Sequence, residues 1–466
     1  MQQHHTPGIP PGCPAHANPQ LFGPEFGSDP EGQYDRLRAA GPSTAVDIAP
    51  GVEVELVTNY DAALYILQNP ALFVRDARRW NALNQGRVPQ DSPALPMMGY
   101  RPNALFSDGA AHARLRRAVT DALSTVDEYR LVRQTQQIAD YLISRFAAEP
   151  LGQADLMADF AQPLPLLVFS DLFGCPPDIG DRVIVGISGI FEGTPGADEV
   201  LGAALMELIA LKHREPGEDL TTRLMQHPAQ LSDEEVLHQL VTLLSGGTAP
   251  LTGAIGTSTS LYLGEDWRAD LPVEDAVTQT LWNYAPIANY AAHYPVRDEQ
   301  LGDRVLRAND PVLISFAAAN RDPKLSEHRE QLSSKAHLAF GAGPHACPAK
   351  DPAFMITVTA VGALLNGLPD VELRVPFKEL SWVPAPWSRS LVTVPLRFTP
   401  RQGPSAAVGS RGPAAGQQTP SQYGSSHPQP PVASSVASTP NQPAHHAAPS
   451  RKGGLFSRFL AWTKGE

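Results

Sequence analysis

The sequence predicts a mainly helical protein with a small β component. Long segments repeat apolar residues at the spacing of an α-helix, whereas only a few short stretches alternate as strands do. The chain has 466 residues, of which 42% are hydrophobic, so it can bury a large core. We therefore expect helices to build most of this core and short strands to form a small sheet.

The first elements expected are a helix, a strand and a second helix. Tyr34, Leu37 and Arg38 share one face at helical spacing. Residues 52–57 alternate like a strand, and residues 61–67 return to the helical pattern.

The longest helix expected begins near Ser232. Ser232 is a suitable N-cap with Glu235 three residues later, a pairing known as a capping box, and the helix would run toward Leu263. Helical spacing also covers residues 130–225, with interruptions at glycine and proline, and a later helix is expected at residues 354–365. Three short strands are expected between the helix that begins near Ser232 and the helix at residues 354–365. They cover residues 293–297, 301–306 and 310–318.

Composition argues against several classes of function. The net charge of -12 gives little electrostatic support to nucleic-acid binding, and we expect no nucleic-acid partner. Cys13, Cys175 and Cys347 are too few and too scattered for a disulfide framework, which fits a reducing cytoplasm. The N-terminus has no apolar signal region, and no run of 18 apolar residues occurs. We therefore expect a cytoplasmic protein that neither is exported nor spans a membrane.

One glycine-rich loop contains the most informative residue, Cys347. Gly341 and Gly343 precede it, and since glycine has no Cβ the backbone there can approach a large flat ligand closely. Phe340 would shield the sulfur side of such a ligand, and His345 would donate a hydrogen bond to an acidic group at its edge. The helix expected after the loop would favour a thiolate through its positive end, and a thiolate against a flat ligand suggests haem. The alternative is a buried cysteine in an ordinary loop.

The spacing from Phe340 to Ala349 resembles the haem-binding loop of cytochrome P450, Phe-x-x-Gly-x-x-x-Cys-x-Gly, with Ala349 in the last glycine position. The resemblance implies a triangular haem-thiolate fold over residues 21–400. It also implies that Cys347 is the axial ligand of the iron of haem b, with dioxygen as co-substrate, and that His345 contacts a haem propionate.

Two further sites match the same family. His112 and Arg116 lie four residues apart, so they share one face of a helix and can grip a carboxylate together. In the family the corresponding histidine and arginine meet a propionate, and His293 takes the place of an arginine with the same role. For His112 and Arg116 the alternative is a solvated basic face on an amphipathic helix.

The long helix departs from the family at the point of oxygen binding. The family places an acid and then a threonine there, whereas this chain has Thr248 in the acid position and Ala249 in the hydroxyl position. Proton delivery therefore cannot use the usual pair, and Ser245, Gly246, Thr248 and Ala249 are the candidate distal residues. A hydroxyl of Ser245, Thr248 or Thr252 would hold a replacement water unless it bonds its own helix backbone. Pro250 should kink the helix because it has no backbone donor.

A second departure concerns the Glu-x-x-Arg pair of the family. Gln279 stands in the glutamate position and Trp282 in the arginine position, so both charges are replaced together. Paired replacement of a buried ion pair is often nearly neutral, which predicts a rebuilt core. The chain resembles a divergent bacterial branch with Gln-x-x-Trp, whose members are often encoded beside sensor kinases and small GTPases.

Both ends of the chain differ from the middle. Residues 1–20 are expected to be a flexible arm, because the spacing of the histidines and of Cys13 fits no zinc pattern. Residues 401–450 are rich in Pro, Ser and Ala and predict a disordered linker. Residues 451–466 then form a basic amphipathic segment.

This last segment predicts a short helix that is independent of the haem domain. Leu455, Phe456, Phe459 and Leu460 share one helical face with basic residues around it. Such a helix suits an anionic membrane surface, which would place the protein at the membrane periphery, or a groove on a signalling partner. The alternative is a tail without function.

Two functions follow from the resemblance. The first is a monooxygenase that takes electrons from a ferredoxin-type donor and inserts one oxygen atom of dioxygen into a small apolar substrate. The second is a haem-binding sensor or scaffold in a signalling complex that kept the cofactor and lost turnover. Cys347 favours the enzyme, whereas the changes at Thr248 and Ala249 favour the sensor.

Overall fold

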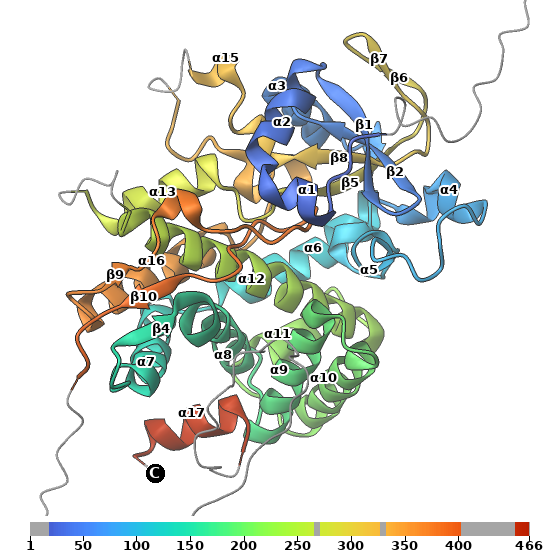
Figure 1. Cartoon of the computed structure of the whole chain (residues 1–466). Helices are drawn as coiled ribbons and strands as arrows, with labels where there is room; N and C mark the ends of the chain where they lie inside the picture. The colour runs from blue at the N-terminus through green and yellow to red at the C-terminus, as the bar shows by residue number, and fades with distance from the viewer. Residues whose placement is uncertain (1–17, 265–270, 327–331, 402–452, 466) are drawn as a thin grey trace, which may run out of the picture. The chain divides into compact units, whose positions relative to one another are not determined.

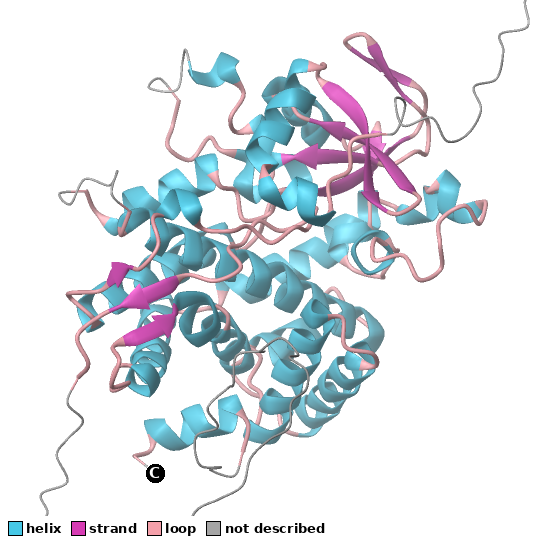
Figure 2. Cartoon of the chain, in the orientation of Figure 1, coloured by secondary structure: helices cyan, strands magenta, loops and turns pink. Residues whose placement is uncertain are grey.

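The computed structural model describes residues 18–264, 271–326, 332–401 and 453–465. Most of the described chain is helical and only a minor part is strand, which confirms the predicted fold class (Figure 2). The residues up to Arg401 and those from Gly453 onward form one compact unit. The N-terminal arm predicted at residues 1–20 lies outside the described residues except for its last three. The linker predicted at residues 401–450 lies outside them except for Arg401.

The helices of the first half precede the longest one. They are α1 (Gly23–Ser28), α2 (Pro30–Ala39), α3 (Tyr60–Gln68), α4 (Asn81–Asn84), α5 (Leu95–Met98), α6 (Gly109–Ser124), α7 (Glu128–Phe146), α8 (Pro163–Leu172), α9 (Pro177–Glu192), α10 (Ala197–Arg214) and α11 (Leu220–Met225). The later ones are α12 (Asp233–Tyr262), α13 (Val273–Asn283), α14 (Phe316–Ala319), α15 (Pro323–Ser326), α16 (Lys350–Gly367) and α17 (Leu455–Thr463). Short 3-10 turns are η2 (Ala77–Arg79), η3 (Ala104–Phe106), η6 (Leu338–Phe340), η7 (Gly343–His345) and η8 (Phe377–Glu379), and η4 (Met157–Ala161) is a π-helix.

The strands form one larger sheet and two small ones. They are β1 (Ser43–Ala49), β2 (Val52–Val57), β3 (Phe73–Val74), β4 (Gln153–Asp155), β5 (Asn289–Pro295), β6 (Glu299–Leu301), β7 (Arg304–Leu306), β8 (Val312–Ser315), β9 (Glu372–Leu373) and β10 (Pro395–Arg397). The larger sheet has the order β1-β2-β8-β5-β3, so its central strand comes late in the chain. Only β2 and β8 pair in parallel within it.

The long helix α12 lies at the centre of the helical part of the unit. It contacts α8, α10, α11, α13 and α16, and it crosses the middle of Figure 1 below the larger sheet. Its first turn has the predicted capping box, in which the Ser232 hydroxyl accepts the Glu235 backbone N–H and the Glu235 carboxylate accepts the Ser232 backbone N–H. The helix continues through Pro250 to Tyr262.

The predicted strand at residues 310–318 is only partly correct. Val312–Ser315 is the central strand β8, but Phe316–Ala319 turns into the short helix α14. The Ser315 hydroxyl accepts the backbone N–H of Ala318 and so ends the strand as an N-cap. Residues 312–318 are apolar except for Ser315, and such a run has no period that distinguishes a buried strand from a buried helical turn.

The prediction that the C-terminal helix is independent of the haem domain is wrong. The helix itself is present as α17, but it packs against α9, α7 and α8 (Figure 1). Phe456 and Phe459 are each only 1% exposed. Their rings therefore lie inside the protein and are not presented to a membrane or to a partner.

Candidate functional site

Cys347 lies between the short turn η7 and the first residue of α16. Its backbone N–H donates to the carbonyl of Phe340 at 2.8 Å, which closes the loop around the glycines. The backbone N–H of Ala349, at the N-terminal end of α16, donates to the sulfur. The loop thus places the sulfur where the predicted helix end and a backbone donor both face it.

Burial is the largest influence on this thiol and raises the pKa of Cys347 above its usual value. The Ala349 backbone N–H and the positive charges of Arg116 and Lys350 act in the opposite direction but do not outweigh it. The helix end alone therefore does not produce the thiolate predicted from the sequence. A cation bound to the sulfur would supply the missing stabilisation, because a coordinating thiol is deprotonated.

The two predicted glycines have different roles. Gly341 and Gly343 both have a φ of +67°, a conformation that favours glycine. A Cβ on Gly343 would lie 2.1 Å from the carbonyl oxygen of Leu67 in α3, whereas a Cβ on Gly341 would have no neighbour closer than 3.7 Å. Gly343 is therefore required by contact with α3, and the expected approach to a flat ligand does not explain it.

The structure brings the predicted propionate partners together. The rings of His112 in α6 and His345 have centroids 4.0 Å apart, and the Arg116 guanidinium donates to the carbonyl of Ala346. Burial, followed by the charges of Arg75, His112, His293 and Arg116, lowers the pKa of His345 to about 2. Burial also lowers the pKa of His112, with Arg116 as the next cause. These imidazoles are neutral near pH 7, and a neutral imidazole still donates one hydrogen bond.

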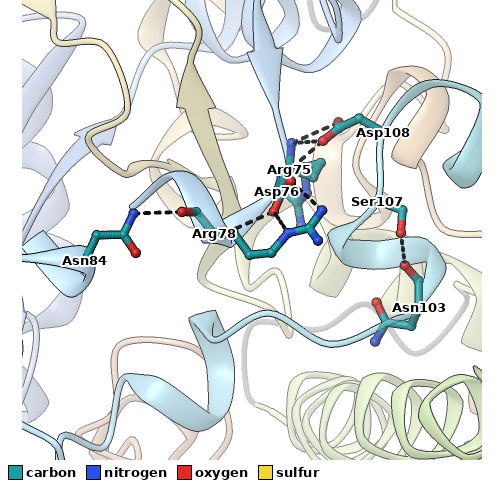
Figure 3. Close-up of polar contacts among 7 residues, drawn as sticks. All are labelled: Arg75, Asp76, Arg78, Asn84, Asn103, Ser107 and Asp108. Atoms are coloured by element: carbon teal, nitrogen blue, oxygen red, sulfur yellow. Dashed lines mark hydrogen bonds and ion pairs between the residues drawn. The ribbon is translucent and has the colours of Figure 1, made fainter. Parts of the chain in front are cut away.

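Arg75 is the residue of this cluster that the sequence analysis missed. It is 2% exposed, and after burial it has the largest effect on the pKa of His345. Its backbone N–H and that of Asp76 both donate to the Asp108 carboxylate, as Figure 3 shows. Its Nε donates to the carbonyl of Leu105 at 3.3 Å. The available signal was a basic residue directly after a buried apolar stretch, a place where a charge is seldom left without a role.

The strand register explains why Arg75 reaches the same place as His293. In the antiparallel pair β3 and β5, Phe73 faces Pro295 and Val74 faces Tyr294. The next pair in this register is Arg75 and His293. Residues opposite each other in an antiparallel pair lie on the same face of the sheet, so both side chains come to the same side.

The distal candidates lie on α12 near Pro250. The Ser245 and Thr248 hydroxyls donate to the carbonyls of Val241 and Leu244, at 2.7 and 2.8 Å, so both bond their own helix. Thr248 is buried, whereas Gly246 is exposed and a Cβ on it would meet nothing within 4 Å. Because Pro250 has no N–H, the Gly246 carbonyl four residues earlier lacks its usual helix donor.

The replaced Glu-x-x-Arg pair has separated into two unrelated contacts. Trp282 is buried, and its Nε1 donates to the carbonyl of Ser334 at 2.9 Å. Its ring also meets the His337 ring edge to face, with centroids 5.7 Å apart. Gln279, in contrast, is exposed and accepts from the side chain of Asn283. The predicted rebuilt core is therefore present at Trp282 and absent at Gln279.

Comparison with known proteins assigns this fold to the cytochrome P450 type. The chain is 32% identical to the cytochrome P450 monooxygenase PikC of Streptomyces venezuelae over 397 residues, which are 81% of this chain and 93% of that protein. The chain therefore belongs to the cytochrome P450 family. No family model matches it.

Other relatives and solved structures support the same assignment. The mycinamicin IV hydroxylase/epoxidase of Micromonospora griseorubida is 30% identical over 374 residues, covering 75% of this chain and 91% of that protein. The structure of CYP154A1 from Streptomyces coelicolor has a TM-score of 0.70 at 28% identity and covers 79% of this chain and 98% of that one. That of CYP154C4 from a Streptomyces species has a TM-score of 0.74 at 27% identity and covers 83% and 99%.

The relatives also decide between the two functions expected from the sequence. They are named as monooxygenases, hydroxylases and an epoxidase, so the protein is a P450-type monooxygenase, and nothing in the comparisons favours the sensor. The family implies haem iron with a thiolate ligand, dioxygen, a small substrate and a redox partner. None of the helices in the described ranges is both long and apolar enough to cross a bilayer.

Proposed function

We propose that Cys347 binds the iron of haem b through its thiolate and that Arg75, His112, Arg116, His293 and His345 bind the haem propionates. The observation that carries the proposal is the excess of buried donors over acceptors beside the cysteine loop. Among the described residues, Arg75 Nη1 and His112 Nε2 are buried without a hydrogen-bond partner. Buried donors left without acceptors cost on the order of 1 to 3 kcal/mol each, so a ligand that accepts them is strongly favoured.

Charge supports the same ligand. Two arginines and two histidines act together on the pKa of His345. The Asp108 carboxylate, 4.0 Å from His345, already accepts the backbone N–H groups of Arg75 and Asp76. Burial raises the pKa of Asp108, because it disfavours the charged carboxylate. The two carboxylates of a haem group would supply both the missing acceptors and the missing negative charge.

The chemistry proposed for the loaded protein is insertion of one oxygen atom of dioxygen into a small apolar substrate. Haem supplies the activation of dioxygen, and a ferredoxin-type protein is the proposed electron donor. The chain's own contribution is to hold the cofactor, exclude water and deliver protons. Proton delivery is the step in which this chain departs from its family.

For that step we propose a water molecule bound at the carbonyl of Gly246. The Ser245 and Thr248 hydroxyl protons are directed to their own helix, whereas the carbonyl of Gly246, an exposed residue, lacks the helix donor that Pro250 cannot supply. A water there would replace the acid and hydroxyl that Thr248 and Ala249 do not provide. Loss of a positioned general acid typically slows a reaction about a hundredfold to ten-thousandfold, so turnover would be slow but present.

Absorbance tests the cofactor. In the reduced carbon monoxide complex of the haem-supplemented protein, the Soret band should be shifted strongly to longer wavelength, as thiolate ligation produces. Cys347→Ala should abolish this shift. Cys175→Ala is the matched control, because Cys175 is buried in the apolar core and burial raises its pKa to about 12. A colourless protein, or a Cys347→Ala spectrum identical to that of the wild type, would contradict the assignment.

Product analysis tests the activity. The protein is incubated with surrogate ferredoxin and reductase and a library of small apolar compounds, and oxygenated product is measured against electrons consumed. We expect product with poor coupling, and Ala249→Thr should raise the coupling by restoring a hydroxyl. Electron flow only to peroxide with every compound would contradict the proposed oxygenation.

A further inference from the structure

The C-terminal helix α17 occupies a groove between α9 and α7. Phe456 and Phe459 are 1% exposed, and Leu455 and Leu460 pack beside them against the main core. The ring of Phe459 lies 5.5 Å from that of Tyr141 in α7, measured between centroids. The four apolar residues that the sequence places on one helical face are thus covered within the chain.

The groove also fits the N-terminus of this helix. Asp181, in the second turn of α9, accepts the backbone N–H groups of Gly454 at 2.9 Å, Phe456 at 2.7 Å and Ser457 at 3.2 Å, as well as the Ser457 hydroxyl. These are the orphan donors of a helix start, and α17 has no side-chain cap of its own. A side chain of α9 therefore serves as the cap of α17.

Close approach requires a glycine on each side. A Cβ on Gly180 of α9 would lie 2.3 Å from Cδ1 of Phe456, and a Cβ on Gly454 would lie 2.4 Å from Cγ of Asp181. A larger residue at either position would force the facing side chain, Phe456 or Asp181, to shift. The apolar, polar and steric features of α9 here all match one occupant, the segment that starts at Gly453.

Docking connects α9 to α7 and, through neighbouring helices, to α12. At the other end of α17, the ring centroids of Trp462 and Tyr141 lie 5.5 Å apart. The guanidinium carbon Cζ of Arg145 in α7 lies 5.9 Å from the centroid of the Tyr141 ring. The helices α9 and α10 pack so closely that only glycine fits at position 186, because a Cβ there would lie 2.7 Å from the backbone nitrogen of Leu201. α10 and α8 in turn contact α12, the helix that carries Gly246.

We propose that this groove is an intramolecular docking site for the C-terminal helix, and that the docked helix straps the pair α9 and α10 to α7. Occupancy of the groove then sets how often α9 and α10 open away from α12. Docking of α17 requires neither bound haem nor the oxygenation reaction. Because the helix is covalently tethered, its docking depends on effective concentration within one molecule and not on protein concentration.

Hydrogen exchange on the full-length protein tests the strap. In the double variant Phe456→Ser, Phe459→Ser we expect amides of α9 to exchange at least about tenfold faster, since opening of a local unit controls their exchange. Peptides from α16 should be unchanged. Lys464→Ser, an exposed change at the end of the same helix, is the matched control and should leave α9 protected. Unchanged exchange of α9 in the double variant would overturn the proposal.

Two further measurements identify the occupant. A synthetic peptide of residues 451–466 added to the double variant should restore protection of α9, and the same peptide with both phenylalanines replaced by serine should not. If the wild-type peptide fails to restore protection, the variant has loosened the fold by another route and the groove assignment is wrong. Protection of α17 in the wild type should be the same across a hundredfold dilution. Loss of protection on dilution would show that a second copy of the chain supplies the helix.

Discussion

The proposed haem-binding cluster and the α17 groove both join segments that are far apart in the sequence, but they differ in how completely their polar atoms are paired. Asp181 accepts three backbone N–H groups and a hydroxyl, so the polar part of the groove is closed. In the cluster, Arg75 Nη1 and His112 Nε2 have no partner among the described residues. A contact that satisfies its own polar groups stabilises the fold, whereas buried donors without acceptors indicate a place for a ligand.

Acid should have the largest effect, and it should act on the side of the proposed haem cluster. Burial lowers the pKa of His337, beside Trp282 on the haem side, to about 4, from 6.5 in the unfolded chain. Below pH 6.5 the unfolded chain therefore takes up a proton that the native protein does not bind until about pH 4. The stability that the neutral His337 gives at pH 7 is lost over this window, by about 3 kcal/mol in total.

Denaturant unfolding between pH 7 and 4 measures this loss. His337→Asn should flatten the pH dependence by about that amount, because asparagine does not titrate. An equally steep pH dependence in His337→Asn would show that the acid sensitivity lies elsewhere.

Removing one donor of the cluster should weaken binding of the cofactor and leave docking of α17 unaffected. Arg75→Met would remove the proposed charge-assisted hydrogen bond to a propionate. Such a bond is worth about 1.5 to 3 kcal/mol, which corresponds to a roughly 10- to 150-fold weaker haem affinity. Haem transfer to an acceptor protein measures it. Arg75→Lys should recover part of the loss, and Arg78→Met, at an exposed arginine nearby, should have no effect. Equal haem release from all three variants would argue against a role for Arg75.

Removing the cap of α17 should have the opposite pattern. Asp181→Ala leaves three backbone donors without their acceptor and should destabilise the docked helix by about 0.5 to 2 kcal/mol, the usual value of an N-cap. Limited proteolysis near residue 453 should then become faster, while haem affinity stays unchanged. Asp178→Ala, on the exposed first turn of the same helix, is the control. Faster haem loss in Asp181→Ala would mean that the two regions are coupled.

The smallest effect is expected at the replaced ion pair. Trp282→Phe keeps most of the buried ring but loses the hydrogen bond from Nε1 to the Ser334 carbonyl, a loss of about 1 kcal/mol. Gln279→Ala, at the exposed position of the same pair, should change stability by less than about 0.5 kcal/mol. Chemical unfolding at pH 7 compares them. A larger loss of stability in Gln279→Ala than in Trp282→Phe would indicate that both positions belong to one coupled core.

The sequence predicted those parts of the fold and site that depend on local pattern. The capping box of α12, the helix after Cys347 and the strand β2 all follow from short-range spacing. Cys347, His112 and His345 were proposed as site residues because their motifs match those of a family residue by residue. Arg75 was missed because its role depends on the register between β3 and β5, which no local pattern encodes.

The docking of α17 was missed for a related reason. The apolar face of the segment was visible, but the surface that covers it lies more than 250 residues earlier, at Gly180 and Asp181. An amphipathic pattern shows that a helix needs a partner and does not show which one. Residues 401–450, which have few large apolar side chains, made a remote partner more natural than the chain itself.

The central position of β8 has a consequence for synthesis of the chain. β2 finds its parallel partner roughly 260 residues later, since Glu55 pairs with Val312, and β5 reaches the sheet only through β8. At translation rates of about 5 to 20 residues per second, the hairpin of β1 and β2 would wait roughly 13 to 50 seconds on the ribosome with one edge open. An open strand edge invites pairing with other chains, so the nascent protein should depend on chaperones until the later strands emerge.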